Sequence, residues 1–237
     1  MDLKGKTIIL TGAARIGQEV AKSLQAKGAT LVLTYRQSRE KVAPFGFALK
    51  ADLSTQEGIF KVVETTVKEF GNVYGLVHMA SVYEKLSWEE LDAGAWDRGM
   101  NVDAKSSFLL GKAVADQMLR YNEGLIKGKI IFFADWSALV RPYPGYLVYN
   151  AAKAAVVGLT KSFAKALAPH ILVNAVAPGP ILQPADLNEE ENQEVLAGTL
   201  LKRWGTPEDI AKGVCYLLDA DFVTGQILTI DGGRTIA

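Results

Sequence analysis

Tyr149 and Lys153 are the two residues of this chain whose types and spacing most directly indicate chemistry. They lie four positions apart at the start of an Ala-rich run, residues 149–168, that is predicted to be helical, so both side chains lie on one helix face. A free tyrosine has a pKa of about 10, and a nearby ammonium group favours the phenolate and lowers that pKa. A tyrosine tuned in this way can pass a proton to or from a carbonyl or imine. The alternative is a buried Tyr and a solvated Lys that share a face by chance.

The size and composition of the chain indicate a single α/β domain. The chain has 237 residues, 49% of them apolar, and 26 basic residues balance 26 acidic ones. Zero net charge argues against nucleic acid or an acidic membrane as a partner, and no apolar run reaches the ~18 residues of a membrane span. The single cysteine, Cys215, excludes an internal disulfide and predicts a cytoplasmic protein. No His/Cys cluster predicts a metal site, and strand-like residues 6–10 predict that no secretory leader is present.

Strand and helix patterns alternate along the chain. Strands are predicted at residues 6–10, 30–34, 45–50, 75–81, 128–134, 171–176 and 226–231, and helices at 20–28, 54–70, 102–121, 149–168 and 207–218. Such alternation favours parallel strands joined by right-handed crossovers. We therefore predict one Rossmann-like, doubly wound parallel sheet of about seven strands, with helices on both faces, spanning residues 1–237. In the helix at 102–121 we expect the core residues to be Phe108, Leu109, Ala113 and Met118.

A glycine-bearing turn follows the first strand. Residues 11–17 (TGAARIG) lead into a helical pattern that ends at Gly28, and a second strand follows. Strand, glycine turn, helix and strand within ~30 residues form the first unit of a dinucleotide-binding fold. Gly12 and Gly17 let the backbone approach a pyrophosphate, and the helix N-terminus favours its negative charge. A plain strand–turn–helix unit could carry the same glycines for turn geometry alone.

The end of the second strand bears on which dinucleotide binds. An NAD-binding unit usually places an acid there, about 20 residues after the glycines, to bind the ribose 2′-hydroxyl. Here Tyr35 and Arg36 take that place, with Arg39 nearby. A guanidinium suits a 2′-phosphate, which a carboxylate would repel, so we predict NADPH as cofactor, with NAD as the lesser alternative. Both arginines could also be ordinary solvated charges, and Asp52, after the third strand, could bond the adenine ring or cap a turn.

Several of these residues together resemble the classical short-chain dehydrogenase/reductase family. The matching residues are Thr11, Gly12, Gly17, Asp52, Asn101, Tyr149, Lys153, the stretch 173–179 (VNAVAPG) and the stretch 231–233 (DGG). The resemblance implies a Rossmann-like fold, a nicotinamide cofactor, a small-molecule substrate and a homotetramer or homodimer. It implies that Tyr149 donates the proton and that Lys153 binds the nicotinamide ribose and lowers the tyrosine pKa. It also implies that Asn101 bends a helix and holds a water of the proton relay.

The same resemblance implies a set of cofactor contacts spread along the chain. These are Thr11, Gly12, Arg15, Ile16, Gly17, Tyr35, Arg36, Asp52, Leu53, Ala80, Tyr149, Lys153, Pro178 and Gly179. Arg15 takes the place of the middle glycine of the common pattern, which resembles the pteridine reductases, where such an arginine faces cofactor phosphate and substrate. The glycine loop is one residue shorter than that of the family.

The serine usual in this family is absent from its place. Counting 13 residues back from Tyr149 gives Trp136, which lies between Asp135 and Ser137. An Asp at the end of this strand resembles the pteridine-reductase-like members, so we predict Asp135 as the polar partner of Tyr149, with Ser137 as the alternative. An Asp that helps to protonate a substrate needs a raised pKa or a chain through Tyr and water. The alternative interpretation is that Asp135 lies at the strand end and only caps the loop that follows.

Three further features concern the substrate side of the predicted site. Tyr83 resembles an aromatic residue that stacks on a pterin, and plain packing at the rim is the alternative. His78 and Met79 depart from the usual Asn-Asn of the family, and we interpret His78 as a hydrogen-bonded structural residue. Residues 180–205 fill the variable substrate loop of the family, and their acidic run at 189–191 could be only a solvated helix face.

The functional hypothesis is an NADPH-dependent reductase, similar to pteridine reductases, that transfers hydride to a carbonyl or imine. Tyr149 would donate the proton with help from Lys153, Asn101 and Asp135. One alternative is a carbonyl or alcohol oxidoreductase of another substrate class, such as a 3-ketoacyl thioester reductase, which Ser137 in the usual serine role would favour. The other alternative is a nucleotide-binding sensor without turnover, with which the shortened glycine loop is consistent.

Overall fold

The computed structural model describes residues 2–183 and 187–237, and its centre is one parallel sheet. Seven strands pair in the order β3-β2-β1-β4-β5-β6-β7, every neighbouring pair parallel. The strands are β1 (Thr7–Thr11), β2 (Thr30–Tyr35), β3 (Phe47–Lys50), β4 (Gly75–His78), β5 (Gly128–Phe133), β6 (Ile171–Pro178) and β7 (Ile227–Ile230). The seven strands and their parallel pairing confirm the fold predicted from the sequence.

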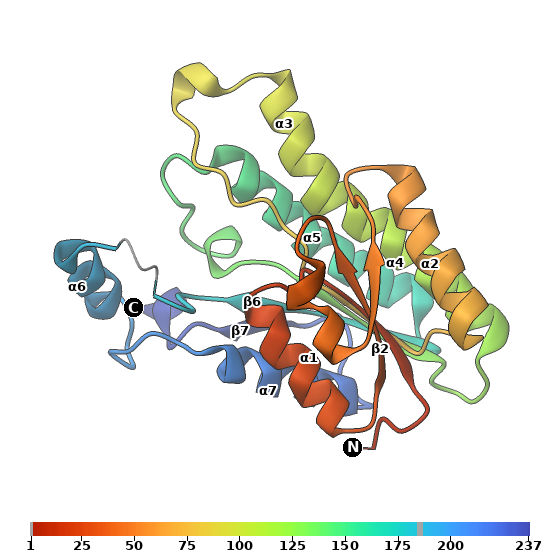
Figure 1. Ribbon diagram of the computed structural model, residues 1–237. Coiled ribbons are helices and arrows are strands. Elements are labelled where there is room, and N and C mark those ends of the chain that lie inside the picture. Colours follow the sequence, from red (N-terminus) through yellow and green to blue (C-terminus); the bar gives the residue numbers. More distant parts are fainter. Residues whose placement is uncertain (1, 184–186) are drawn as a thin grey trace.

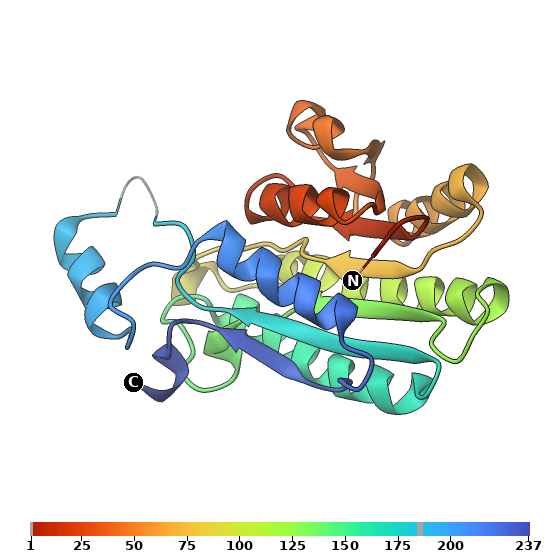
Figure 2. The same ribbon diagram turned by 90° about the horizontal axis from the view of Figure 1, so that it is seen from below.

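Helices cover both faces of the sheet (Figures 1 and 2). Helices α2 (Gln56–Phe70), α4 (Ser106–Tyr121) and α5 (Leu147–Leu167) pack on one face, and α1 (Ile16–Ala26) and α7 (Pro207–Asp219) pack on the other. Two further helices, α3 (Ala93–Met100) and α6 (Glu189–Ala197), lie toward the carboxyl ends of the strands. None of the helices in the described ranges is long and apolar enough to cross a membrane.

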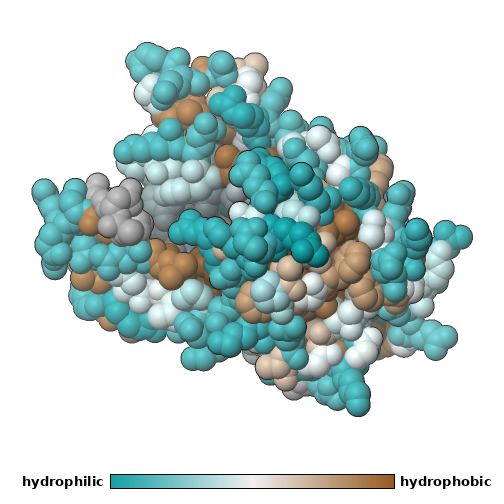
Figure 3. All heavy atoms as spheres, in the orientation of Figure 1, coloured by the Kyte–Doolittle hydropathy of each residue, from teal (hydrophilic) through white to brown (hydrophobic). Residues whose placement is uncertain are grey.

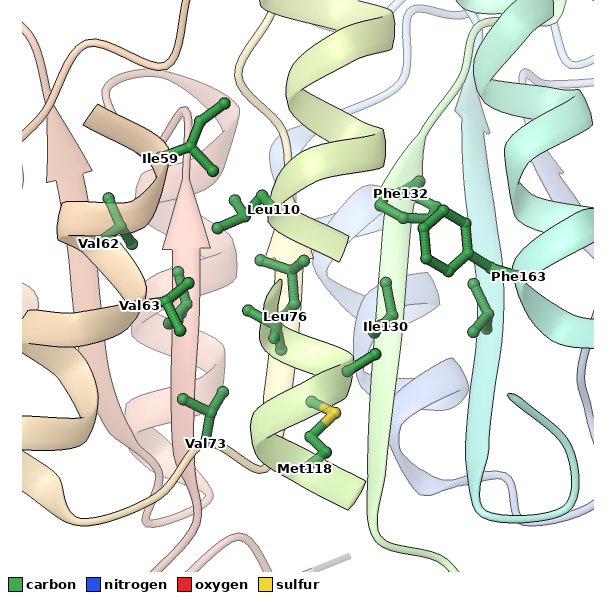
Figure 4. Close-up of a cluster of buried hydrophobic side chains, with 14 of the residues drawn as sticks. Ile59, Val62, Val63, Val73, Leu76, Leu110, Met118, Ile130, Phe132 and Phe163 are labelled. Carbon is green, nitrogen blue, oxygen red and sulfur yellow. The ribbon is translucent and has the colours of Figure 1, made fainter. Parts of the chain in front are cut away.

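Each face of the sheet has its own apolar core. On the α2–α4–α5 face, Figure 4 shows Leu110 of α4 next to Leu76 of β4, with Val62 of α2 farther along the same face, and all three are inaccessible to solvent. Phe132 of β5 packs edge-on against Phe163 of α5, with ring centroids 5.7 Å apart. Burying a side chain of this size stabilises a fold by about 1.5–3 kcal/mol. The buried residues recur along β4 and β5 without alternation, as expected for strands covered on both faces.

Local sequence signals set the helix ends. Thr55 caps α2 by accepting a hydrogen bond from the Gly58 amide, and Thr206 caps α7 in a capping box with Asp209, with Pro207 in the first turn. Gly28 follows α1 with φ +85°, the left-handed conformation that glycine adopts readily. These ends confirm the boundaries predicted from the sequence.

The long helix predicted at residues 102–121 is different in the structure. It begins earlier, as α3, passes through a π-helical turn at Asn101–Lys105 and continues as α4. The placement of Phe108 in the core was wrong, because its side chain is 48% exposed on the outer face of α4, whereas Met118 is fully buried. The buried stripe of α4 runs through Ser107, Leu110, Val114 and Met118, and Phe108 lies outside it.

The carboxyl ends of the central strands meet along one edge of the sheet. Thr11 lies beside His78 in the β1–β4 register, and His78 lies beside Phe132 in the β4–β5 register. The segments that leave these strands therefore converge at this edge. On the face seen in Figure 3, the surface is hollowed between the side that bears α3 and the side that bears α6.

Candidate active site

Tyr149 and Asp135 come together at the carboxyl edge of the sheet. Tyr149 lies in the first turn of α5, and Asp135 follows β5 directly. The Tyr149 hydroxyl donates a hydrogen bond of 2.7 Å to Oδ2 of Asp135. The other carboxylate oxygen, Oδ1, accepts the Ser137 amide at 2.8 Å, so the acid also caps the turn at residues 136–138. Asp135 therefore contacts Tyr149 with one oxygen and caps its own loop with the other.

Ser137 is turned toward a different neighbour. Its hydroxyl donates to the amide oxygen of Asn150 at 3.1 Å. The Asn150 amide nitrogen in turn donates to the Tyr143 carbonyl at 2.9 Å. Asn150 thereby fastens the loop between β5 and α5 to the start of α5. Of the two residues predicted as the partner of Tyr149, the structure brings Asp135 to its hydroxyl and uses the Ser137 hydroxyl in holding this loop.

Lys153 lies one helical turn after Tyr149 and is almost completely buried. Its ammonium donates to the Phe133 carbonyl at 2.9 Å and lies 2.8 Å from Oδ1 of Asp103. The ammonium is also 5.6 Å from the centroid of the Tyr149 ring. The predicted pair thus shares a helix face and a buried site, and the chance-sharing alternative, with Lys153 in solvent, is wrong.

The pKa of Tyr149 departs from the value predicted from its spacing to Lys153. Burial raises this pKa far above its ordinary value, and the negative charge of Asp135 raises it further. The lowered pKa expected from the spacing to Lys153 is not found in the protein without ligand, because burial and then the carboxylates Asp135 and Asp103 raise the pKa of Tyr149. Burial also raises the pKa of Asp135, against the hydrogen bonds from Ser137 and Tyr149. Both groups therefore hold protons more tightly than free Tyr and Asp do.

Asn101 marks the π-helical turn between α3 and α4. The Ser106 amide donates to the Asn101 carbonyl, five residues back, where a regular α-helix would use the residue four back. The widened turn fits the helix-bending role that the resemblance implies. It also brings Asp103 inward, to within hydrogen-bond distance of Lys153.

Asp103 is a site residue that reading the sequence missed. Its side chain is fully buried, and its carboxylate accepts the Ser81 hydroxyl at 2.5 Å and the Val82 amide at 2.9 Å in addition to pairing with Lys153. The available signal was its position two residues after Asn101 in the sequence. That position alone does not show that Asp103 is buried, because its hydrogen-bond and ion-pair partners lie 21 or more residues away in the sequence.

Aromatic rings surround the Tyr149 phenol. Tyr83 stacks on Tyr146, with centroids 4.3 Å apart, and meets the Tyr149 ring edge-on at 4.8 Å. Tyr143 packs edge-on against both Tyr83 and Trp136, and the Trp136 indole donates to the Tyr143 hydroxyl. Tyr83 remains 57% exposed. It therefore lies between the phenol and the solvent. Its neighbour Tyr146 was not predicted as a site residue.

His78 is a buried, hydrogen-bonded histidine, as predicted. Thr11 Oγ1 accepts the amides of Met79 and Ala80, so its own proton is directed to His78 Nδ1 at 2.8 Å. Nε2 then donates to Ser106 Oγ at 2.7 Å, and Ser106 donates to a backbone carbonyl. Burial, followed by the charge of Lys153, lowers the pKa of His78 to about 4. His78 is thus neutral and joins β1 to the π-helical turn.

A cavity of about 310 Å³ lies beside this edge of the sheet. Of the predicted cofactor contacts, it is lined by Gly12, Tyr35, Arg36, Asp52, Leu53 and Ala80. Gly12 has φ +70°, and a Cβ there would lie 2.5 Å from the Met79 backbone, so only glycine fits. Oδ1 of Asp52 accepts both the Ser54 amide and the Ser54 hydroxyl, which is the turn-capping alternative. The bare backbone at Gly12 and the guanidinium of Arg36 suit a phosphorylated dinucleotide.

Other predicted contacts lie outside that cavity. Arg15 is exposed just before α1, and Gly17 packs against the Gly12 carbonyl. Pro178 ends β6, and Gly179 packs against Asp231. The neighbouring residues line a second cavity of about 490 Å³ between β7 and the segment around Leu200. Part of the predicted substrate loop at 180–205, residues 184–186, lies outside the described residues.

Comparisons with known proteins agree with this geometry. A family profile described as enoyl-(acyl carrier protein) reductase matches residues 12–235. The chain is 32% identical to 2-dehydro-3-deoxy-D-gluconate 5-dehydrogenase of Dickeya dadantii, over 98% of this chain and 96% of that protein. It is 33% identical to the 3-oxoacyl-(acyl-carrier-protein) reductase FabG of Thermotoga maritima, over the full length of both.

A solved structure gives the same picture in three dimensions. A short chain dehydrogenase from Burkholderia cenocepacia J2315 in complex with NADP superposes with a TM-score of 0.89 and 28% identity, over 99% of each chain. The chain therefore belongs to the short-chain dehydrogenase/reductase family of oxidoreductases.

Proposed function

We propose that the protein is an NADPH-dependent reductase of a carbonyl or imine, with a pterin as its substrate class. The observation that carries the proposal is the 2.7 Å hydrogen bond from Tyr149 to Asp135, one helical turn from buried Lys153. A tyrosine placed in this way can deliver a proton, and the acid bonded to it can restore that proton.

The residues of the site divide the reduction between them. When bound, NADPH supplies a hydride to the carbonyl or imine carbon of the substrate. Tyr149 gives its hydroxyl proton to the oxygen or nitrogen of that group, and Asp135 takes up a proton from solvent water and passes it to the phenolate. Two protein acceptors bind the Lys153 ammonium in the described part of the chain, so its third N–H would bond the ribose beside the nicotinamide. Asn101 would hold a water of the relay at its widened helical turn.

The preference for NADPH is supported by the wall of the 310 Å³ cavity. Arg36 lines this cavity directly after β2, with Ser38 beside it, and no acid takes their place at the strand end. A guanidinium there favours a ribose 2′-phosphate. The Burkholderia cenocepacia structure described above was solved with NADP, which is consistent with this choice. Asp52 and Leu53 line the same cavity and would face the adenine.

A flat heterocyclic substrate is supported by the tyrosines around the phenol. Tyr83 presents a half-exposed ring next to Tyr149, and Tyr146 stacks on it. Such rings favour a planar, aromatic ligand. The resemblance of the segment from Asp135 to Tyr149 to pteridine reductases points to the same class, and Arg15 would face the substrate in that arrangement.

A second candidate is a carbonyl or alcohol oxidoreductase that acts on 3-ketoacyl thioesters or on sugar-derived acids. The names of the relatives favour it, since a 3-oxoacyl reductase and a deoxygluconate dehydrogenase are similar to the chain over nearly its whole length. The departure of Asp135 and Trp136 from the usual serine position argues for the pterin class instead.

The test is a substrate panel with NADPH oxidation followed by absorbance. Dihydropterins, a 3-ketoacyl thioester and ketonic sugar acids are each assayed with the wild-type protein and with Tyr149→Phe. We expect turnover of a dihydropterin, and a fall in kcat of about 10²-fold or more in Tyr149→Phe with NADPH binding retained. Turnover of ketoacyl thioesters alone would support the second candidate. Binding of NADPH without turnover of any substrate would indicate the sensor alternative.

Assembly and location complete the proposal. We expect a homotetramer, or a homodimer, in the cytoplasm. Exposed apolar side chains on α4 and α5, including Phe108 and Leu147, support association through these helices. Light scattering coupled to gel filtration measures the number of subunits directly.

A further inference from the structure

Asp103 is a buried acid whose role goes beyond the residues that the proposed chemistry requires. It lies in the π-helical turn between α3 and α4, and its side chain is 0% exposed, with Lys153 at 4%. Oδ1 pairs with the Lys153 ammonium at 2.8 Å and accepts the Ser81 hydroxyl at 2.5 Å. Oδ2 accepts the Val82 amide at 2.9 Å. One carboxylate thus joins three separate segments of the chain.

These contacts connect the catalytic helix to the cofactor cavity. Ser81, Val82 and Val102, the residue before Asp103, all line the 310 Å³ cavity. Lys153 does not line that cavity. Its ammonium lies 2.8 Å from Asp103, however, and Asp103 holds Ser81 and Val82, which do line it. A movement of the Ser81–Val82 segment would therefore be transmitted through Asp103 to the Lys153 ammonium.

The contacts also fix the direction of the one remaining N–H of Lys153. An ammonium has three N–H groups. The Phe133 carbonyl takes one and Asp103 takes another. Buried acceptors on different elements thus fix the directions of two N–H bonds of Lys153. Because the ammonium group can then no longer rotate, the direction of the third N–H bond is fixed as well.

The charge of Asp103 acts on Tyr149 as well. The charged and titratable groups around Asp103 are Lys153 and Tyr149 of α5, Asp135 after β5 and His78 of β4. His78 is neutral, since its pKa is lowered to about 4. The Lys153 ammonium therefore faces two carboxylates, Asp103 and Asp135, and the three groups together carry a net charge of minus one. Removing the charge of Asp103 would leave one positive and one negative charge beside Tyr149.

We propose that Asp103 is a positioning residue of the reductase, which holds the Lys153 ammonium and the Ser81–Val82 segment in one fixed arrangement. The inference rests on the proposed function, because it assigns Asp103 to the reaction of Tyr149 and Lys153. Asp103 acts through Lys153 and the cavity wall, and its negative charge keeps the Tyr149 proton on the phenol until the substrate takes it.

The test uses Asp103→Asn, which keeps the shape of the side chain and removes its charge. We expect kcat to fall about tenfold or more, because the ammonium is no longer held in place. The Kd for NADPH, measured by fluorescence, is expected to stay within about threefold, because the side-chain oxygen of Asn can still accept the Val82 amide and hold the cavity wall. The alkaline fall of kcat/KM is expected to begin about one pH unit lower or more, because one of the two acids that hold the proton on Tyr149 has lost its charge.

Asp221→Asn is the matched control. Asp221 lies 2.6 Å from Lys129, another buried lysine, at the amino end of β5. The control makes the same substitution beside the same kind of partner, far from the site, so we expect wild-type kcat and pH dependence. A melting temperature for each variant separates loss of fold from loss of rate.

Two results would overturn the inference. In the first, Asp103→Asn matches the wild type in kcat and in the alkaline limb, whatever its melting temperature. In the second, kcat falls while the alkaline fall of kcat/KM stays at the same pH. A general loosening of the structure around Asp103 would explain that result without a role for its charge. If Asp103→Asn does not fold, Ser81→Ala replaces it, since it keeps both charges and releases only the loop. A several-fold lower kcat at unchanged NADPH affinity then supports the inference, and an unchanged kcat overturns it.

Tyr149→Phe is measured on the same substrate in every case. If Tyr149→Phe is as active as the wild type, the proposed function fails and the role of Asp103 fails with it. If Tyr149→Phe is inactive while Asp103→Asn behaves as the wild type, only the inference about Asp103 fails.

Discussion

The Tyr149 hydroxyl lies 2.7 Å from Oδ2 of Asp135, and this hydrogen bond joins the first turn of α5 to the end of β5. The same carboxylate accepts the Ser137 amide through its other oxygen. Since a backbone amide holds the acid from one side, the acid can present its free edge to Tyr149 in a constant direction. Burial raises the pKa of Asp135 and of Tyr149 alike, so both groups hold a proton more tightly than a free Asp and Tyr do.

The first prediction concerns the exchange of that proton. In Asp135→Asn the amide can still contact Tyr149 but cannot return a proton, so we expect kcat to fall about 10²-fold. Ser137→Ala is the matched comparison, because its hydroxyl is bonded to Asn150, and we expect its kcat to stay within about threefold of the wild type. Steady-state kinetics with NADPH and a turned-over substrate measure both. A larger loss in Ser137→Ala than in Asp135→Asn would assign the role to the serine.

The second prediction concerns the cofactor phosphate. Arg36→Ala removes the guanidinium from the cavity wall, and we expect the Kd for NADPH to rise about 10- to 100-fold while that for NADH changes little, because hydrogen bonds to charged groups contribute about 1.5–3 kcal/mol. Arg39→Ala is the control, since Arg39 begins the next short helical turn and does not line the cavity. Fluorescence titration with both nucleotides provides the measurement. Equal losses for NADPH and NADH would contradict a contact to the 2′-phosphate.

The strands could be predicted from the sequence because each is a continuous apolar run. β5 is buried along its whole length, and such runs are distinctive wherever helices cover both faces of a sheet. Helix α3 was missed because it is only eight residues long and contains two glycines, which disfavour a helix. Phe108 was misplaced because the buried stripe of α4 begins with two small polar residues, Ser106 and Ser107, which hydropathy alone does not mark as core.

The candidate site was predictable only in part. The spacing of Tyr149 and Lys153 correctly indicated that they share a buried helix face. The direction of the pKa shift of Tyr149 could not be obtained from that spacing, because it depends on burial and then on Asp135 and Asp103, which the fold brings from other elements. A carboxylate 50 residues from its ammonium partner in the sequence leaves no periodic signal. Long-range electrostatics therefore had to come from the structure.

The third prediction concerns stability at acid pH. The folded pKa of His78 is about 4, below its ordinary value of 6.5. Below pH 6.5 the unfolded chain takes up a proton that the folded chain refuses, so stability present above pH 6.5 is lost as the pH falls toward 4. The loss is roughly 3 kcal/mol, from 1.36 kcal/mol for each pKa unit. Urea unfolding of the wild type and of His78→Asn between pH 7 and about pH 4 measures it.

His78→Asn separates this effect from the titration of carboxylates. Asn does not titrate, so the acid-dependent loss of the variant should be smaller than that of the wild type by the share of His78. The variant is expected to be less stable at neutral pH, because it weakens the bonds to Thr11 and Ser106. Parallel stability curves for the two proteins would show that His78 is charged in the folded state or does not contribute.

The last prediction concerns Gly12, at the turn between β1 and α1. Gly12→Ala places a methyl group at φ +70° and 2.5 Å from the Met79 backbone, which is itself held by the hydroxyl of Thr11. Gly5→Ala is the matched control, because Gly5 has φ +75° and no atom within 4 Å of the added methyl group. Among the residues that the structure describes, the control therefore meets no neighbour and carries the backbone strain alone, which we expect to cost about 1 kcal/mol.

Gly12→Ala adds a steric clash to the same strain, so we expect a total cost of about 3 kcal/mol. The clash must push either the turn into the cofactor cavity or the Met79–Ala80 backbone away from β1, and both Gly12 and Ala80 line that cavity. NADPH affinity should therefore fall in Gly12→Ala and remain at the wild-type level in Gly5→Ala. Urea unfolding and fluorescence titration of the two variants measure the two effects separately. If both variants lose the same stability and both still bind NADPH, the close approach at Gly12 has no role in shaping the cavity.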